Sequence, residues 1–333
     1  MFNRREFFGM GVLTALAGYV STGEAEPVVA SGGNAASRSF FDDNLSIIFS
    51  DAHVCGEEVR AARFTPKRMK AFVDEVLAMR PLPKRVIHLG DLAYLHGHPA
   101  DYAVSKPMLK RLEAAGIELV FCMGNHDRRS AFNQAWPGIL DKSPVPGKYV
   151  SVTSLGTADL VILDGLQGTD DRPLTEMGPG NGKLTPDQIA WLKKDFPKRT
   201  RPFFVASHFP VGELKLTEKK YGDLGHWLIK NAPQCAGYLY GHIHRWRPEW
   251  IHGGWKSRNT FRTLSVPSGG LWGDIGYVTL RTSADRAVCT LELKDFYFPA
   301  EPSDPNDRPA PWRLRMDEIR GSTCTFLYDR QGG

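Results

Sequence analysis

The chain has 333 residues, of which 42% are hydrophobic and 24% are charged, and its formal net charge is +5 at pH 7. This length supports one large domain or two small ones with a sizeable core, and the composition is that of an ordinary globular protein. The basic residues are scattered, which excludes a Lys/Arg block of the kind that binds nucleic acid, so we expect no nucleic-acid partner.

The first predicted element is an export segment that lies outside the fold. Arg4 and Arg5 precede a Gly-rich apolar run from Gly9 to Val20, shorter than the ~20 apolar residues that span a bilayer. The segment resembles a bacterial twin-arginine signal followed by a small, polar linker. We therefore expect residues 1–38 to be an export signal and linker. The twin-arginine (Tat) machinery is then a partner, and the mature protein is periplasmic without a stable membrane span. The alternatives are a Sec signal or an uncleaved anchor.

Short apolar runs alternate with helical patterns between residues 39 and 300, which predicts one layered α/β domain. The strands towards the end of this range follow one another directly and favour antiparallel pairing, so we expect mixed sheets. The predicted strands are Leu45–Ser50, Arg85–Leu89, Ile117–Met123, Tyr149–Thr153, Leu160–Leu163, Pro202–Ser207, Gly237–Tyr240, Phe261–Val266, Tyr277–Arg281 and Ala287–Leu293.

Three helices are predicted between these strands. Thr65 is expected to cap the first, with Pro66 in its first turn, and a second is expected near Val104–Ala115. The third begins with a predicted capping box of Thr185 and Gln188. Residues 301–333 are expected to be a C-terminal extension packed on the domain, with an irregular Pro/Asp-rich segment at its start.

The five cysteines are Cys55, Cys122, Cys235, Cys289 and Cys324, and no CxxC spacing occurs. A thiolate zinc cluster is therefore not expected, and the odd number leaves at least one thiol free in an exported protein. Cys122 lies in an apolar run and is expected in the core. Cys55 follows His53 closely, so it either packs in the core or approaches the site formed by that histidine.

Five polar motifs follow predicted strands directly. They are Asp51-Ala52-His53, Gly90-Asp91, Gly124-Asn125-His126-Asp127, Ser207-His208 and Gly241-His242-Ile243-His244. In layered α/β folds, sites form at the carboxyl ends of strands, so we expect these five distant segments to converge. Apart from Asp127, the motifs supply two carboxylates, one amide and five imidazoles. This set is enough to bind two adjacent metal ions and leaves one histidine without a metal. Such a dinuclear site indicates hydrolysis of a phosphate ester by metal-activated water.

The ordered series D-x-H, G-D, G-N-H-D, H and G-H-x-H resembles the calcineurin-like metallophosphoesterases, and it spans residues 51–244. The resemblance implies a four-layer α/β/β/α sandwich with two mixed sheets. It also implies two divalent metal ions, of which Mn, Fe, Zn and Co all suit mixed oxygen and nitrogen ligands. By the same resemblance, the first metal is held by Asp51, His53 and His244, the second by Asn125, His208 and His242, and Asp91 bridges both.

The resemblance further implies that a hydroxide shared by the two metals attacks phosphorus. The remaining histidine, His126, would then stabilise the phosphate and protonate the leaving group. Asp127 follows directly, and we expect it to orient the ring of His126. The alternative for His126 is a structural role.

Two details point to branches of the superfamily. The segment Leu163-Asp164-Gly165, the glycines Gly178, Gly180 and Gly182, and the helix at Gln188–Leu192 are similar to the bacterial class III cyclic-nucleotide phosphodiesterases. Gly90-Asp91-Leu92-Ala93-Tyr94 instead matches the purple acid phosphatase pattern, whose tyrosine binds ferric iron. That family has D-x-G as its first motif, whereas this chain has His53, so we expect Tyr94 to lie behind the ligands, near His126.

We therefore expect a phosphoesterase acting on a small phosphate ester, with phosphodiesters favoured over monoesters. The alternatives are a purple-acid-type phosphomonoesterase that uses Tyr94, and a non-catalytic binding scaffold. The motifs leave the oligomeric state and the identity of the substrate open. Other candidate contacts to substrate are His96, His98, Arg128, Arg129, Arg245, Arg247, the tryptophans at 246, 250, 255 and 272, and the segment Leu214–Lys230.

Overall fold

The computed structural model describes residues 40–56, 62–167, 182–217, 222–252, 260–271, 273–292 and 318–329. The predicted export signal and linker at residues 1–38 lie outside these ranges, as do Gly178, Gly180, Trp255 and Trp272. Within the described chain, every helix is too short or too polar to cross a membrane.

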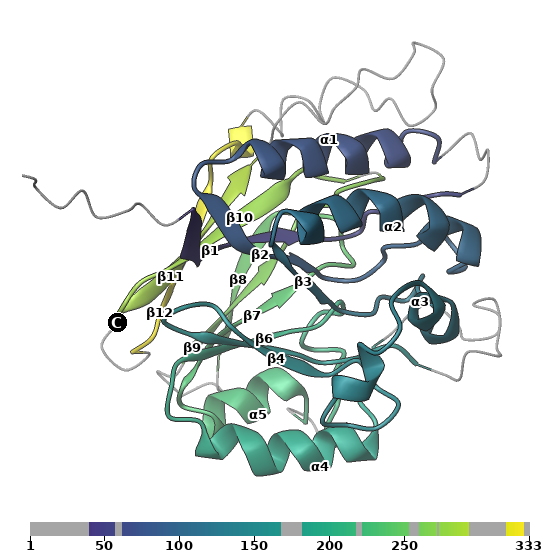
Figure 1. Ribbon diagram of the computed structural model, residues 1–333. Coiled ribbons are helices and arrows are strands. Elements are labelled where there is room, and N and C mark those ends of the chain that lie inside the picture. Colours follow the sequence, from purple (N-terminus) through teal and green to yellow (C-terminus); the bar gives the residue numbers. More distant parts are fainter. Residues whose placement is uncertain are drawn as a thin grey trace, which may run out of the picture. The chain divides into compact units, whose positions relative to one another are not determined.

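The first sheet has six strands in the order β12–β11–β10–β1–β2–β3 (Figure 1). Its parallel half consists of β1 (Phe41–Phe49), β2 (Leu82–His88) and β3 (Glu118–Phe121). Its antiparallel half consists of β10 (Tyr277–Thr282), β11 (Arg286–Glu292) and β12 (Thr323–Leu327). Since β1 pairs in parallel with β2 and antiparallel with β10, the sheet is mixed, as predicted.

The second sheet also has six strands, in the order β4–β5–β6–β7–β9–β8. Its parallel centre consists of β5 (Asp159–Ile162), β6 (Phe203–Ala206), β7 (Cys235–Tyr240) and β9 (Thr260–Ser265). The antiparallel edges are β4 (Ser151–Ser154) and β8 (Arg247–His252). Both sheets therefore contain a parallel core whose strands end at one edge, where polar side chains can meet.

Helices cover the outer face of each sheet and give the predicted α/β/β/α order of layers. The first sheet is covered by α1 (Thr65–Ala78), α2 (Pro99–Ala114) and α3 (Arg129–Ala135), and the second by α4 (Pro186–Asp195) and α5 (Leu224–Asn231). Short 3₁₀ turns lie at Leu140–Lys142 and Phe196–Lys198. Figure 1 shows α1 and α2 on one side of the paired sheets and α4 and α5 on the other.

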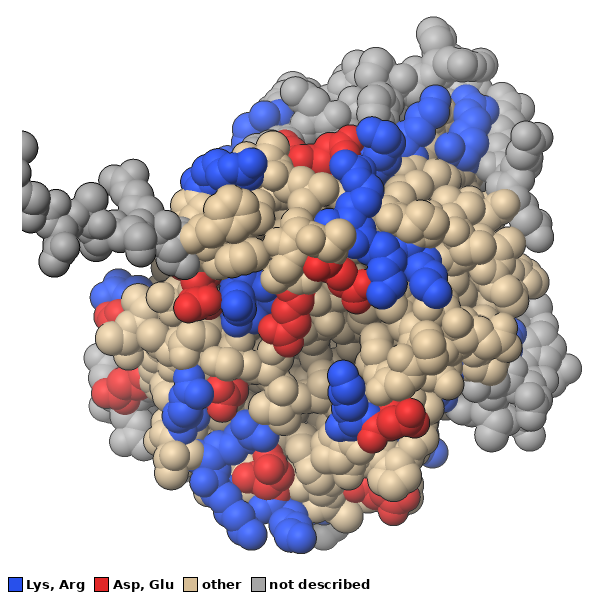
Figure 2. Space-filling model, viewed as in Figure 1, with Lys and Arg blue, Asp and Glu red and all other residues tan. Residues whose placement is uncertain are grey.

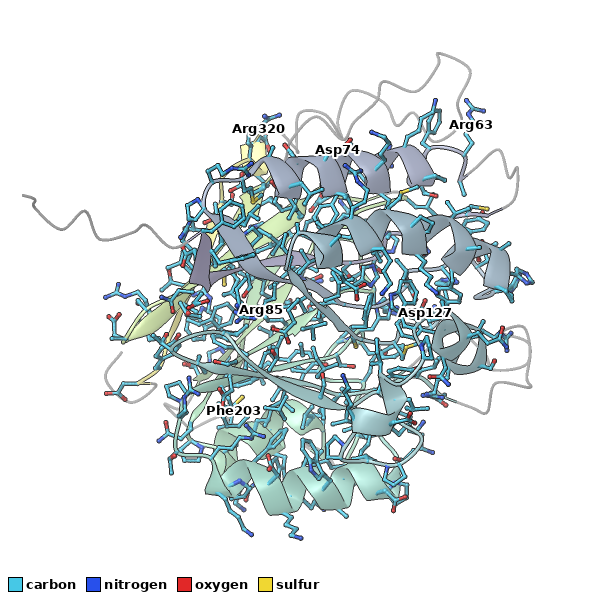
Figure 3. The ribbon with its side chains drawn as sticks, viewed as in Figure 1. Arg63, Asp74, Arg85, Asp127, Phe203 and Arg320 are labelled. Carbon is cyan, nitrogen blue, oxygen red and sulfur yellow. The ribbon has the colours of Figure 1, made fainter. Side chains whose placement is uncertain are left out.

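Alternation along the central strands builds three apolar layers, because successive side chains of a strand point to opposite faces. In β1, Ile47 packs under the helices of the first sheet, whereas Ile48 packs between the two sheets. In β6, Phe204 lies between the sheets and Phe203 packs against α4 and α5 (Figure 3). Burial of each such side chain contributes roughly 1.5–3 kcal/mol. These continuous apolar strands fix the backbone at whose ends the polar motifs lie.

All ten predicted strands coincide with observed ones, but β8 and β12 are additional. Pro248 and the exposed side chains of β8 hide its strand pattern, which is that of a sheet edge. The second additional strand, β12, comes from the segment predicted as a C-terminal extension, and it extends the first sheet beside β11. The helices α3 and α5 are also additional, because each is short.

Two predicted helix caps are wrong in detail. The N-cap of α1 is Phe64, and the hydroxyl of Thr65 donates to Ala62 O within the turn before the helix. Thr185 does cap α4 by accepting from the amide of Gln188. The side chain of Gln188 does not complete the box, because it bonds the backbone of Asp164 at both ends.

On the face shown in Figure 2, the described charged residues are not divided into a basic and an acidic region, because Lys and Arg side chains lie interspersed with Asp and Glu. Exposed ion pairs such as Lys70–Asp74, whose side chains are 64% and 41% exposed, contribute little to stability. The charges that matter for chemistry are therefore the buried ones at the strand ends.

Candidate metal centre

The five polar motifs come together where the parallel strands of both sheets end. Asp51, Asp91 and Asn125 follow β1, β2 and β3 of the first sheet, and His208 and His242 follow β6 and β7 of the second. The sheets are joined directly at this point, since the amide of His242 donates to the carboxylate of Asp51 at 3.1 Å. The convergence predicted from the sequence is thus observed.

The backbone turns sharply at these strand ends. Among the described residues, the non-glycine residues with positive φ are Asp51, His53, Asp91, His242 and His244, with φ between 45° and 67°. Left-handed backbone of this kind costs of order 1–3 kcal/mol per residue, and it clusters at functional sites. All five are predicted metal ligands. The unfavourable backbone conformation at these residues therefore orients the side chains of the predicted ligands.

Two glycines are required by the closeness of these turns. A Cβ atom on Gly124 would collide with the carboxylate and backbone of Asp91, and one on Gly241 would collide with Ser50 and Asp51. Gly124 and Gly241, which precede Asn125 and His242, therefore let these two ligand loops pass close to the loop of Asp91 and the loop of Asp51.

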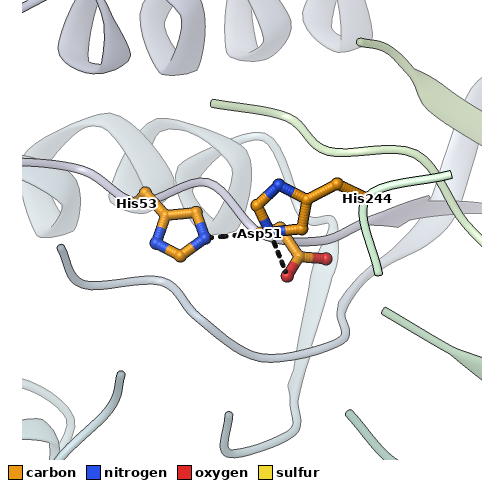
Figure 4. A group of neighbouring side chains, drawn as sticks. All are labelled: Asp51, His53 and His244. Atoms are coloured by element: carbon orange, nitrogen blue, oxygen red, sulfur yellow. Dashed lines mark hydrogen bonds and ion pairs between the residues drawn. The ribbon is translucent and has the colours of Figure 1, made fainter. Parts of the chain in front are cut away.

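The first cluster consists of Asp51, His53 and His244, which are all buried (Figure 4). Nε2 of His244 lies 3.1 Å from Oδ1 of Asp51 and 3.2 Å from Nε2 of His53. The three ligand atoms lie within 4.8 Å of one another. This is the set predicted for the first metal.

The second cluster consists of Asp91, His208 and His242, whose ligand atoms also lie within 4.8 Å of one another. Nε2 of His208 lies 3.1 Å from Oδ2 of Asp91. Oδ1 of Asn125 lies 3.1 Å from Nε2 of His208 and 2.9 Å from Nδ1 of His242, so the predicted amide ligand faces the same point.

Asp91 connects the two clusters. Its Oδ2 atom, 3.1 Å from His208, is also 3.8 Å from Nε2 of His53 and 3.9 Å from Nε2 of His126. A buried carboxylate between two sets of imidazole and oxygen donors suits a pair of adjacent divalent ions, and the residues present therefore fit that cofactor.

Burial and mutual charge shift the protonation of these side chains. Burial lowers the pKa of His53 to about 3 and that of His242 to about 4. Burial alone would also lower the pKa of His208, but the carboxylates of Asp91 and Asp51 raise it to about 9. Neighbouring histidines hold the pKa values of Asp51 and Asp91 below the ordinary range, against the opposing effect of burial. The cluster is thus anionic at its carboxylates, and His208 is the imidazole whose charged form they favour.

Backbone carbonyls orient the imidazoles, which the sequence could not indicate. Nδ1 of His208 donates to Leu89 O at 2.8 Å, which directs its Nε2 atom towards Asp91. Nδ1 of His126 donates to Leu95 O at 2.9 Å, and its Nε2 atom faces Asp91. Ser50 adds a 2.6 Å hydrogen bond to Oδ2 of Asp51. Such outer partners fix ring orientation and ligand geometry.

The prediction that Asp127 orients the ring of His126 is wrong. The carboxylate of Asp127 accepts from the amides of Gly124, Leu92 and Ala93, and from the hydroxyl of Tyr102. Asp127 therefore ties the loop after β2 to the loop after β3, inside the fold (Figure 3). Burial and the charge of Asp91 raise its pKa to about 6.

Tyr94 and Cys55 pack together beside the site. With Ala62 and Leu271 they form a small apolar group, and Cys55 does not belong to the clusters of possible ligands among the described residues. Burial raises the pKa of the Tyr94 hydroxyl. The observation against the purple-acid alternative is His53, which fills the place of the glycine in that family's first motif and joins the first cluster.

Several predicted substrate contacts have structural partners instead. Arg129 is buried and makes a bidentate ion pair with Asp164 at 2.8 Å. Arg245 pairs with Asp274, and Arg247 pairs with Glu249 on β8. In the segment Leu214–Lys230, Leu224 and Leu228 of α5 pack on the second sheet, which explains the segment as part of an outer layer.

Comparison with known proteins gives the following likenesses. A sequence model of the calcineurin-like phosphoesterase family matches residues 46–246. The chain is 25% identical over 292 residues to a probable cyclic nucleotide phosphodiesterase of Rhodopseudomonas palustris, covering 85% of this chain and 93% of that protein. It is 22% identical over 210 residues to a cAMP/cGMP dual specificity phosphodiesterase of Mycobacterium tuberculosis, covering 61% of this chain and 62% of that protein. Its fold is similar to that of a dimetal phosphatase from Danio rerio, with a TM-score of 0.52 and 14% identity over 74% of this chain and 95% of that chain.

Proposed function

Because the chain belongs to the calcineurin-like phosphoesterase family, we propose that it is a dinuclear-metal phosphodiesterase that hydrolyses small phosphodiesters. The observation that carries the proposal is the position of Asp91. One buried carboxylate lies between His53 on one side and His208 on the other, as a bridge between two ions requires. The two similar curated proteins are named as phosphodiesterases, which supports diesters over monoesters.

In this proposal the residues divide into two ligand sets and one bridge. Asp51, His53 and His244 hold one ion, Asn125, His208 and His242 hold the other, and Asp91 belongs to both. When bound, two divalent ions supply Lewis-acid stabilisation of phosphate charge and acidify the attacking water. Asn125 is a neutral oxygen donor, so it adds no negative charge where an anionic substrate must bind.

His126 is proposed to donate a proton to the leaving oxygen. Its Nδ1 atom is committed to Leu95 O, so the proton must leave from Nε2, which faces the clusters. Its side chain is 22% exposed, whereas those of His53 and His208 are 1% and 0% exposed, so His126 alone of the three also meets solvent and substrate. This separation suits an acid that exchanges its proton with water between turnovers.

The test is hydrolysis of bis(p-nitrophenyl) phosphate and p-nitrophenyl phosphate by purified protein loaded in turn with Mn²⁺, Fe²⁺, Zn²⁺ and Co²⁺. We expect the diester to be cleaved with the higher kcat/KM, and the Asn125→Ala variant to serve as the blank. Absence of hydrolysis of both esters under every metal would exclude the enzymatic function. A higher kcat/KM for the monoester would exclude the preference for diesters.

We also infer that the protein is exported through the twin-arginine route, on the basis of Arg4 and Arg5 before a short apolar run. That route carries folded proteins, so the ions can be loaded before export.

A further inference from the structure

Phe209 follows His208 directly in the chain, and its ring packs against two imidazoles of the second cluster. Its ring centre lies 5.1 Å from that of His208, with an angle of 86° between the ring planes, and 5.4 Å from that of His242, with an angle of 48°. The residue is only 1% exposed, so it is closed off from solvent. Any effect of this ring on the site therefore acts through the imidazoles that it packs against.

The two imidazoles differ in how they are held. Nδ1 of His208 donates to Leu89 O at 2.8 Å, so a hydrogen bond on the far side of the ring fixes its orientation. His242 directs Nδ1 towards Asn125 and His208, and within the described ranges its Nε2 atom has no hydrogen-bond partner. A metal-binding histidine is ordinarily held by a partner on its other ring nitrogen. His242 lacks that partner in the described chain, and the ring of Phe209 packs against it instead.

The ring of Phe209 is itself fixed from several directions. A Cβ atom on Gly165 or on Gly182 would collide with this side chain, so the backbone at both glycines packs directly on it. The hydroxyl of Tyr238 donates to Phe209 O at 2.7 Å and holds its backbone. Gly165 ends the motif Leu163-Asp164-Gly165, and the closeness of the ring explains why a glycine stands there. Phe209 is therefore a rigid support and not a mobile side chain.

We propose that Phe209 is a positioning residue of the metal centre, which orients the imidazole of His242, and with it that of His208, for the second ion. The proposal rests on the dinuclear centre of the function given above, in which the second ion is the one held by Asn125, His208 and His242. Among the described residues, the imidazoles in ring contact with Phe209 are those of His208 and His242. The first ion is therefore independent of this ring.

The experiment is a calorimetric titration of the metal-free full chain with Mn²⁺, which needs no substrate. We expect wild type to bind two ions, and Phe209→Leu to weaken one of the two binding events at least about tenfold while the other stays unchanged. Asn125→Ala identifies the weakened event, because it removes a ligand of the second ion alone. The matched control is Phe203→Leu, since Phe203 is a buried phenylalanine of the same apolar layer, at the opposite end of β6 from His208. The control should keep both affinities.

Gly165→Ala is an independent test that leaves Phe209 in the chain. Its Cβ atom would displace the ring of Phe209, so the same binding event should weaken. In the Phe209→Leu variant the flexible leucine can turn away from position 165, and adding Gly165→Ala should then weaken binding no further. The effects of the two changes are therefore expected to be non-additive, as for residues in contact. Thermal unfolding of each variant verifies that it is folded at the temperature of the titration.

Unchanged affinities in Phe209→Leu, equal loss of both, or a loss that Phe203→Leu reproduces would overturn the proposal, since none of these results is specific to the second ion. Additive effects of Gly165→Ala and Phe209→Leu would overturn it as well. Failure of the proposed function gives a different result, namely two bound ions with the expected pattern in the variants but no hydrolysis of either ester. A wild-type chain that binds no ion would overturn both the metal centre and the role of Phe209.

Discussion

Nε2 of His208, at the end of β6, lies 3.1 Å from Oδ2 of Asp91, at the end of β2, so this pair joins the two sheets. Both side chains are buried, and the imidazole bears the positive charge that balances the carboxylates. The pair marks the place where a cation belongs, and a bound divalent ion would replace the proton that His208 holds there.

Metal binding is therefore expected to release about one proton from His208 at pH 7–8, because its pKa is raised to about 9 and only neutral imidazole binds a metal. His53 and His242 contribute no further proton at this pH, since burial lowers their pKa values to about 3 and about 4. The affinity for the metal should fall about tenfold for each pH unit below 9. It should fall more steeply only at acidic pH. Calorimetry in buffers of different ionisation enthalpy measures the release, which His208→Gln should abolish. A heat of binding that is equal in all buffers would contradict this assignment.

Asp127→Asn is expected to lower metal affinity by about 10–100-fold, the usual effect of losing an outer partner of the ligands. Its carboxylate accepts from amides on both ligand loops, and an amide side chain turns one acceptor into a donor that faces other donors. Metal titration followed by calorimetry measures the loss. If Asp127 acted instead on the ring of His126, affinity would stay constant, and kcat with its pH dependence would change.

Arg129→Met is expected to destabilise the metal-free fold by about 3–5 kcal/mol, because it leaves the buried carboxylate of Asp164 without its charged partner. Burial raises the pKa of Asp164, but the charge and hydrogen bonds of Arg129 lower it by more, so the net shift of this pKa is downward. A depressed carboxylate pKa stabilises the fold above the unfolded value of about 3.9, and this contribution is lost as the pH falls through the folded value. Urea unfolding at pH 7 and pH 3 should therefore show a smaller difference between variant and wild type at the lower pH.

The matched control for that experiment is Arg286→Met, which breaks the exposed pair with Asp285. We expect its unfolding midpoint to equal that of wild type. The double variant Arg129→Met with Asp164→Leu should recover much of the lost stability, because no buried charge then remains unpaired. A double variant no more stable than Arg129→Met would show that packing, or the hydrogen bonds that Asp164 accepts from the amides of Tyr149 and Leu166, and not charge, is responsible.

Replacing Arg4 and Arg5 with lysine is expected to retain the protein in the cytoplasm, if the twin-arginine interpretation holds. Fractionation of cells that express the full chain, with an antibody against the folded domain, measures the distribution. Changing Arg38 to lysine provides the control outside the signal. Export that continues in the double lysine variant would favour the Sec alternative.

The sequence predicted the convergence of the polar side chains well because each lies directly after an apolar run that forms a strand. The bridging position of Asp91 was implied by the family resemblance and not by this placement. What the sequence could not show is the role of backbone atoms, since Leu89 and Leu95 act through their carbonyls and any residue type supplies one. Asp127 was misassigned for a related reason: adjacency in the chain to His126 does not determine where a side chain points after a turn.

The left-handed backbone at Asp51, His53, Asp91, His242 and His244 has a consequence for laboratory evolution. At such positions glycine relieves the conformational energy, whereas alanine retains it. His53→Gly should therefore give a more stable metal-free chain than His53→Ala, although both have lost the ligand, and thermal unfolding in chelator compares them directly. A selection for heat resistance without substrate would accordingly enrich glycine at the centre of the site, and the most robust descendants of this chain would be inactive ones.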